Sequence, residues 1–205
     1  MNSQSCLEIL REIKDVAFAT VDAKGLPQVR IIDVMLIDQG KLYFCTARGK
    51  DFYHELTASG QVAITGLNRD YQMVRLSGQA YRLKEQKEWI DRIFEENPSM
   101  KEVYPENSRY ILEAFCVENG QMEFFDLGKS PIIRESFSLG EDEAERKEFE
   151  ITNTCIGCGR CQHSCPQQCI QSGTPFVIQQ EHCLHCGLCY ENCPVQAIRK
   201  RGKET

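Results

Sequence analysis

The sequence lacks the long apolar run that a membrane span requires. No stretch of 18 uninterrupted apolar residues occurs in its 205 residues, which argues against a transmembrane helix. Residues 1–14 also lack the basic start and the apolar core of a signal peptide. We therefore expect a cytoplasmic protein that has no membrane partner.

Two further absences narrow the range of functions. No G-x-G-x-x-G motif follows a predicted strand, so a Rossmann dinucleotide site has no support. The chain has 24 Lys and Arg against 30 Asp and Glu and shows no basic stripe, which argues against a nucleic-acid partner. Cysteine, by contrast, is abundant. In a reducing compartment, clustered cysteines more often bind metal or perform redox chemistry than form disulfides, and this chain has 12 of them.

The cysteines divide the chain into two regions. Three are scattered over the first 150 residues, and nine fall between residues 155 and 193. Between these regions, residues 140–150 (GEDEAERKEFE) are polar and indicate a solvated linker or a short surface helix. We predict a first domain at 1–128, a linker at 129–150 and a second domain at 151–205.

The first domain has many predicted strands and few predicted helices. Periodicity and end signals predict helices at 5–14, 50–60 and 85–96. Extended, β-branched segments predict strands at 16–22, 28–37, 42–47, 61–67, 71–83, 109–118 and 121–127. Asn119-Gly120 is a strong two-residue turn signal, so we expect the last two strands to form a hairpin. This pattern predicts a mainly β, antiparallel small barrel with flanking helices.

The second domain contains a duplicated four-cysteine motif. The pattern C-x2-C-x2-C-x3-C-P occurs twice, 28 residues apart, and the similarity extends beyond the cysteines. In such a motif the first three thiolates bind one cubane and the fourth binds the other, so the spacing predicts two [4Fe–4S] clusters. The first set is Cys155, Cys158, Cys161 and Cys193. The second set is Cys183, Cys186, Cys189 and Cys165.

The alternative for these cysteines is zinc. Zinc sites usually combine two C-x-x-C pairs around one tetrahedral ion, and two four-cysteine runs followed by proline exceed that requirement. Cys169 occupies the position of Ala197 in the second repeat, and we expect it to be a packed cysteine and not a ligand. Residues 148–201 resemble the bacterial two-cluster ferredoxins, which implies a small α+β domain.

The first domain offers a candidate phosphate site. Arg30 lies in a β-branched strand, and Thr46-Ala47-Arg48-Gly49-Lys50 follows a strand end and opens a helix. Together they bring a hydroxyl, cations and helix N–H groups, which suit a phosphate. The alternative is that Arg30 only faces solvent on a half-buried sheet.

The same segments carry a family resemblance. ATVDAKGLPQVRIIDVMLIDQGKLYFCTARGKDFYHEL, followed by QVAI and VRLSGQAYRL, is similar to the pyridoxamine 5′-phosphate oxidase-like flavin-binding split barrels over residues 5–128. The resemblance implies FMN at the interface of a homodimer. It further implies that Arg30 and Lys50 hold the FMN phosphate, that the backbone of Ile31, Ile32 and Asp33 lies along the isoalloxazine, and that Thr46 lines the site.

The resemblance leaves the substrate open. The substrate-binding C-terminal segment of the oxidase is not evident, so we do not expect pyridoxamine phosphate as substrate; the shorter nitroimidazole-resistance proteins are closer in outline. No residue stands out as a general acid or base, and Tyr53, His54 and Tyr71 qualify only by their chemistry.

The two regions together predict an iron–sulfur flavoprotein oxidoreductase. An external low-potential, ferredoxin-like donor would pass electrons through the two clusters to FMN, and from there to a small oxidised substrate. Two alternatives stay open. One is a non-catalytic electron carrier or redox sensor, and the other is a barrel that binds haem or a deazaflavin, as relatives in the wider superfamily do.

Overall fold

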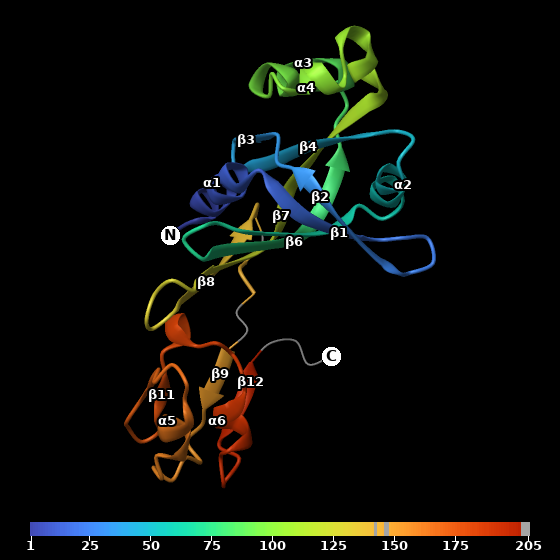
Figure 1. The fold of residues 1–205 in the computed structure, drawn as a ribbon. Helices are drawn as coiled ribbons and strands as arrows, with labels where there is room; N and C mark the ends of the chain where they lie inside the picture. The colour runs from blue at the N-terminus through green and yellow to red at the C-terminus, as the bar shows by residue number, and fades with distance from the viewer. Residues whose placement is uncertain (142, 146–147, 202–205) are drawn as a thin grey trace. The chain divides into compact units, whose positions relative to one another are not determined.

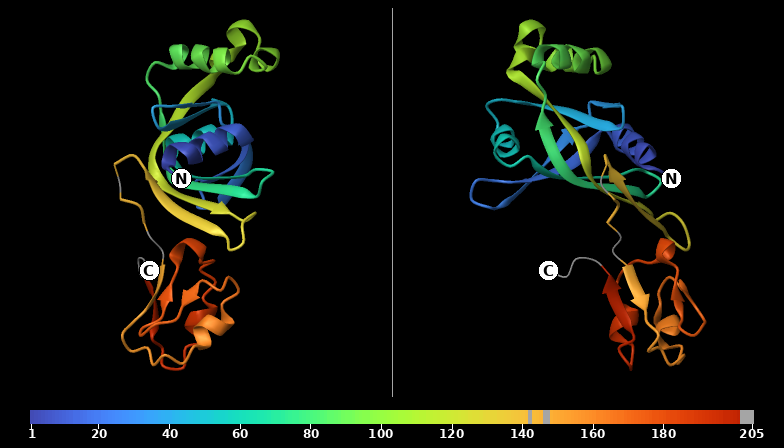
Figure 2. Two further views of the ribbon diagram at one scale, coloured as in Figure 1. Left: turned by 90° about the vertical axis from the view of Figure 1, so that its left-hand side faces the viewer. Right: turned by 180° about the vertical axis from the view of Figure 1, so that it is seen from behind.

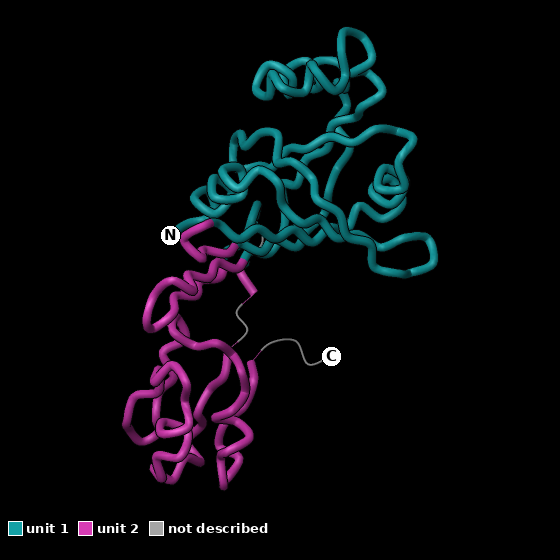
Figure 3. The backbone as a smooth tube through the Cα atoms, in the orientation of Figure 1, with its two compact units in different colours: residues 1–68, 74–122, 137–143 teal, residues 69–73, 123–136, 144–205 magenta. Residues whose placement is uncertain are grey.

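The computed structural model describes residues 1–141, 143–145 and 148–201. The chain divides into two compact units (Figure 3). Unit 1 comprises residues 1–68, 74–122 and 137–143, and unit 2 comprises residues 69–73, 123–136 and 144–205. The predicted fold class is confirmed: a mostly antiparallel β barrel is followed by a small α+β region. None of the helices in the described ranges is long and apolar enough to cross a membrane.

The barrel is formed by one sheet (Figure 1). Its strands follow the order β2-β1-β5-β6-β7-β4-β3, and β8 pairs with β7. These strands are β1 (Asp15–Val21), β2 (Pro27–Asp33), β3 (Leu36–Asp38), β4 (Lys41–Ala47), β5 (Gln61–Leu67), β6 (Gln72–Arg82), β7 (Leu112–Asp126) and β8 (Ile133–Leu139). Alternating burial in β1 and β5 places every second side chain in the interior, as expected for strands with one solvated face.

Aromatic side chains fill the barrel. The ring of Phe44 lies 4.8 Å from that of Phe18 and 5.7 Å from that of Phe115, measured between centroids. Helix α2 (Asp51–Ala58) adds Phe52, whose ring lies 5.8 Å from that of Phe44. Helix α1 (Ser3–Ile13) and α2 lie on opposite sides of the barrel (Figures 1 and 2). Because Phe52 is in the first turn of α2, this aromatic contact fixes the N-terminus of that helix on the barrel.

A helical excursion separates β6 from β7. It consists of α3 (Gln86–Glu96), α4 (Met100–Val103) and a 3₁₀ helix, η1 (Glu106–Ile111). Ile90, Ile93 and Phe94 of α3 form one apolar cluster with residues of β4, β7 and the chain before β3: Met35, Cys45, Leu112 and Ala114. Trp89 stacks on Tyr43 with 4.7 Å between ring centroids. The outer face of β4 is therefore buried as well as its inner face.

The predicted hairpin at Asn119-Gly120 is wrong, because β7 runs unbroken through both residues. Here glycine permits a close approach of two strands. A Cβ atom on Gly78 would lie 2.3 Å from the carbonyl oxygen of Asn119, and one on Gly120 would lie 2.5 Å from the carbonyl oxygen of Ser77. The two glycines thus allow β6 and β7 to meet where any side chain would separate them.

The predicted strand at 28–37 is divided. Val34 and Met35 are consecutive and both buried, which breaks the alternation of a single strand. Val34 N–H donates to the carbonyl of Lys14, whereas Met35 N–H donates to the carbonyl of Tyr43. The backbone hydrogen bonds of the chain therefore change at this point. Up to Val34 they join β1 and Lys14, the residue before β1, and from Met35 they join β4.

The predicted linker at 129–150 contains regular structure. It includes all of β8 and the start of β9 (Glu148–Ile151). Between residues 140 and 150 the described residues form no helix, so the expected surface helix is not found there; residues 142, 146 and 147 lie outside the described ranges.

Unit 2 repeats one pattern twice. Strand β9 pairs with β12 (Ile198–Arg201), and β10 (Ile170–Gln171) pairs with β11 (Val177–Ile178). Each cysteine loop leads into a short helix, α5 (Arg160–Ser164) or α6 (Leu188–Glu191). The apolar core consists of Phe149, Ile151, Ile170, Phe176, Ile178 and Ile198 together with cysteines from both loops.

Candidate cofactor sites

Two cavities lie among the cysteine loops of unit 2. Each is lined by four cysteines of the duplicated motif, three from one repeat and the fourth from the other. Cavity I, of about 310 Å³ including space open to solvent, is lined by Cys155, Cys158, Cys161 and Cys193. Cavity II, of about 340 Å³ on the same measure, is lined by Cys165, Cys183, Cys186 and Cys189. These groups have the same members as the two ligand sets that the motif spacing predicts.

The two repeats build their loops in the same way. Gly159 and Gly187 adopt the left-handed conformation, with φ of 75° and 82°, immediately before α5 and α6. Glycine takes this conformation without a steric penalty, so each loop turns sharply into its helix. The helices then bury Cys161 and Cys189, while Cys158 and Cys186 remain exposed at the cavity edges.

The thiols surround each cavity and do not converge on a single point. Among the residues that the structure describes, no three His, Cys, Asp or Glu side chains come close enough together to hold one metal ion. A structural zinc needs four ligands at about 2.0–2.3 Å from a common centre, whereas a [4Fe–4S] cluster is held by four thiolates around a much larger core. The donor set and the cavities therefore fit [4Fe–4S] clusters better than zinc.

Cavity II also contains Cys169. Its Sγ atom lies 3.5 Å from Sγ of Cys165, and its side chain is buried. A hydrogen bond from the Cys169 thiol lowers the pKa of Cys183 to about 6 and raises the pKa of Cys169 itself. In the other repeat, the backbone N–H of Ala197 donates to Cys193 at 3.2 Å. The repeats therefore differ in the groups that face their fourth cysteines.

Arg30 lies in a buried ion-pair network on β2. Its guanidinium is 2.8 Å from Glu55 Oε2 and also donates to the hydroxyl of Thr20, which in turn donates to Glu55. The side chain of Glu55 is only 6% exposed. The guanidinium also lies over the ring of Phe52, 4.6 Å from its centroid. The predicted phosphate ligand is therefore already paired with a carboxylate of α2.

Lys50 lies close to the same place, because it is the N-cap residue directly before α2, two positions before Phe52. The structure thus brings Arg30 and Lys50 to the first turn of one helix. Ile31 is exposed on the face of β2 opposite Arg30, and Ile32 is half-buried. The Asp33 carboxylate is 3.7 Å from the ammonium of Lys14, and burial raises its pKa.

Thr46 is buried at the end of β4, beside Glu113 of β7 in the register of the sheet. Its hydroxyl oxygen has no hydrogen-bond partner within the described part of the chain. Buried polar atoms are nearly always hydrogen-bonded, so this orphaned hydroxyl is consistent with a group that the protein binds here. It is the feature of the barrel that best fits a bound cofactor.

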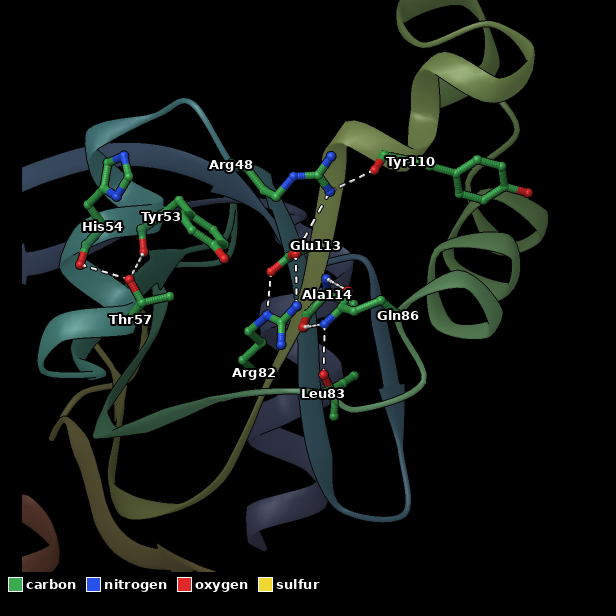
Figure 4. Close-up of polar contacts among 10 residues, drawn as sticks. All are labelled: Arg48, Tyr53, His54, Thr57, Arg82, Leu83, Gln86, Tyr110, Glu113 and Ala114. Atoms are coloured by element: carbon green, nitrogen blue, oxygen red, sulfur yellow. Dashed lines mark hydrogen bonds and ion pairs between the residues drawn. The ribbon is translucent and has the colours of Figure 1, made fainter.

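Glu113 is at the centre of a second charged cluster (Figure 4). Arg82 binds its carboxylate through two nitrogens, with Nη2 at 2.9 Å from Oε1. Arg48 approaches to 3.8 Å and donates to the carbonyl of Tyr110 at 2.8 Å. Hydrogen bonding from Arg82 holds the pKa of Glu113 below its usual value, whereas the hydrogen bond from Tyr53 to Glu113 raises the pKa of Tyr53.

The other two acid–base candidates from the sequence lie outside this hydrogen-bonded cluster. His54 is exposed, and its ring contacts that of Tyr53 edge-on. Tyr71 is 63% exposed and belongs to unit 2. Sequence reasoning did not single out Glu55 or Glu113, because a lone glutamate in an amphipathic helix or strand gives no sign that it is buried.

Family comparison identifies both parts of the chain. The profile of the pyridoxamine 5′-phosphate oxidase family matches residues 3–110, more than half of the sequence. The chain belongs to this family. In this member of the pyridoxamine 5′-phosphate oxidase family, residues 154–197 match a second family, the 4Fe-4S dicluster domain. Both resemblances noted in the sequence are thereby confirmed.

Solved structures share the fold of this family member. A NimC/NimA family protein from Clostridium acetobutylicum is 24% identical over 67% of this chain and 92% of its own, with a TM-score of 0.57. A protein from the same organism is related to general stress protein 26 of Bacillus subtilis. It is 14% identical over 66% of this chain and 96% of its own, with a TM-score of 0.52. A heme binding protein from Mycobacterium smegmatis is 13% identical over 66% of this chain and 57% of its own, with a TM-score of 0.51. At these identities the similarity concerns the fold alone. No curated protein matches the sequence.

Proposed function

We propose that this protein is an iron–sulfur flavoprotein oxidoreductase. Two [4Fe–4S] clusters held by the cysteines would accept single electrons from an external low-potential, ferredoxin-like donor, and FMN held by the barrel would supply two-electron chemistry toward a small oxidised substrate. The observation that carries the proposal is the presence, in one chain, of a pyridoxamine 5′-phosphate oxidase barrel and two cavities that are each lined by four cysteines of the duplicated motif.

The cluster ligands in this proposal are the eight cysteines of the duplicated motif that line the two cavities. The structure supports them because each predicted set lines one cavity. Exposed Cys158 and Cys186 give each cluster an edge that is accessible to a protein donor. Cys169 is assigned a packing role, because cavity II has four thiols without it.

The FMN ligands in this proposal are Arg30, Lys50 and Thr46, with the backbone of Ile31, Ile32 and Asp33. Lys50 and the first N–H groups of α2 supply a positive end for the phosphate. Arg30 adds charge from the adjacent strand, although Glu55 neutralises part of it. The exposed apolar side chains of Val29 and Ile31 support the accompanying proposal of a homodimer, because they offer β2 an apolar surface to bury.

Replacing Lys50 with Ala is expected to weaken FMN binding by about ten- to a hundredfold. A charge-assisted hydrogen bond to phosphate contributes about 1.5–3 kcal/mol, which corresponds to that range. Equilibrium flavin titration of the variant measures the change. Lys24→Ala, at an exposed turn, is the matched control and leaves the affinity unchanged. An unchanged affinity in Lys50→Ala would place the phosphate elsewhere.

The proposed electron path is tested by anaerobic stopped-flow with a reduced ferredoxin as donor. We expect the cluster absorbance to respond first and the flavin absorbance second, and Cys186→Ala to slow flavin reduction. Free dithionite still reduces the flavin of that variant directly, because it needs no protein docking. Flavin reduction by the ferredoxin at an unchanged rate in cluster-depleted protein would contradict the path.

A second candidate function is a haem-binding barrel with attached clusters. It is favoured by one observation, the fold shared with the heme binding protein from Mycobacterium smegmatis. The visible spectrum of anaerobically purified protein distinguishes the candidates. Flavin gives a band near 450 nm and haem a Soret band, and a barrel without either chromophore indicates an electron carrier or redox sensor.

A further inference from the structure

A buried arginine lies in unit 2, outside the cysteine loops. The Arg134 side chain on β8 is 9% exposed and pairs with Glu123, with 2.5 Å between Nη2 and Oε1. Its guanidinium also lies over the ring of Phe125, 4.9 Å from the centroid. Burying a guanidinium costs several kcal/mol of desolvation that a single ion pair does not reliably offset. A position of this kind therefore merits a functional explanation.

The segment that carries Arg134 is fixed to cavity II. The backbone N–H of Ile132 donates to Gln167 Oε1 at 3.2 Å, and its carbonyl is 2.9 Å from Nδ1 of His182. Gln167 lines cavity II, and His182 directly precedes Cys183. Figure 3 shows residues 123–136 in the same compact unit as the cysteine loops. Two hydrogen bonds thus hold the start of β8 against both repeats at this cavity.

The charge of Arg134 reaches cavity II. The pKa of Cys183, a motif cysteine of that cavity, is lowered mainly by the thiol of Cys169 and further by Arg134. The pKa of the neighbouring His185 is lowered by burial and further by Arg134, while Glu123 acts on it in the opposite direction. Cavity I is lined by an arginine of its own, Arg160, but that side chain is exposed. Water screens an exposed charge strongly and a buried charge weakly. The charges at the two cavities are therefore unequal: a buried arginine, partly offset by Glu123, acts at cavity II, whereas an exposed arginine lines cavity I.

We propose that Arg134 is a positioning residue that raises the reduction potential of the cluster in cavity II above that of the cluster in cavity I. Each transfer oxidises the external donor by one electron and adds one negative charge to a cluster, with no bond made or broken. A buried positive charge stabilises the reduced, more negative cluster. At equilibrium, an electron added to the protein therefore lies mainly on the cluster in cavity II. This inference rests on the proposed function only in requiring that both cavities hold clusters.

The test is a potentiometric titration of the full-length, cluster-loaded protein, followed by electron paramagnetic resonance. Arg134→Gln is expected to lower the higher of the two midpoints and to shift the electron distribution between clusters by about tenfold, which is about 59 mV for a one-electron couple. Arg134→Lys keeps the charge and retains most of the wild-type midpoint. Glu123→Gln removes the opposing charge and moves the same midpoint upward.

Two comparisons make the result decisive. Arg160→Gln is the matched control at cavity I and leaves the higher midpoint unchanged. Opposite shifts in Arg134→Gln and Glu123→Gln support an electrostatic role, because a purely structural role moves both variants in the same direction. Unchanged midpoints in Arg134→Gln, with wild-type iron and sulfide content, overturn the inference and leave the proposed function intact. Wild-type protein without iron and sulfide overturns the proposed function itself.

Discussion

Replacing Cys186 with Ala is expected to remove about half of the iron from the protein. Two [4Fe–4S] clusters hold about eight irons per chain, and the variant takes one of four thiolates from cavity II only. The iron content therefore falls to about four, and so does the content of acid-labile sulfide. Cys158→Ala has the same effect at cavity I. Iron and sulfide assays on anaerobically purified protein, together with flavin release, measure both outcomes.

Cys169→Ala is the matched control for this prediction. Cys169 lines the same cavity and lies 3.5 Å from Cys165, yet it stands outside the predicted ligand set. Its removal is expected to leave about eight irons per chain. Loss of iron in Cys169→Ala, or recovery of zinc without sulfide in the wild type, would contradict the ligand assignment.

Replacing Arg30 with Ala is expected to destabilise unit 1 by about 3 kcal/mol, whether or not flavin is bound. The variant leaves Glu55 buried without its guanidinium partner, and breaking a buried pair in this way costs about 3–5 kcal/mol. We expect the lower end because the side chain of Arg30 is 22% exposed. Denaturant unfolding followed by the fluorescence of Trp89, the sole tryptophan, reports on this unit.

Two further variants separate the roles of Arg30. The double variant Arg30→Ala/Glu55→Ala is expected to be less destabilised than the sum of the single variants, because it leaves no unpaired charge. Arg92→Ala breaks a more exposed pair with Asp38 and costs less than about 1 kcal/mol. If Arg30→Ala lowers flavin affinity and leaves unfolding unchanged, Arg30 acts on the phosphate alone.

The sequence predicts the cysteine module far better than the barrel. Eight cysteines at fixed spacing define their grouping directly, and the two cavities contain the same two groups. The barrel strands are recognisable from alternation, but Asn119-Gly120 gives a turn signal where the structure has a continuous strand. A glycine that permits strand contact and a glycine that permits a turn give the same local signal, and only Gly78 on the facing strand decides between them.

The ion pairs of the barrel could not be predicted from the sequence for a similar reason. Arg30 was singled out, yet its partner Glu55 lies 25 positions away on a different element. Glu113 lies in a strand with apolar neighbours. It contacts Arg82 and Arg48 because the fold brings β6, β7 and the end of β4 together. Long-range pairing of this kind depends on topology, which local periodicity does not encode.

The exchange of fourth cysteines between the repeats has a consequence for how the module can be inherited. Each cavity takes three cysteines from one half and the last from the other. A cut anywhere between Cys165 and Cys183 leaves each half with its own four cysteines but with only three for the cavity that it frames. Neither half is thus a separable building block. A rearrangement that keeps one repeat and discards the other therefore leaves neither cavity with four motif cysteines.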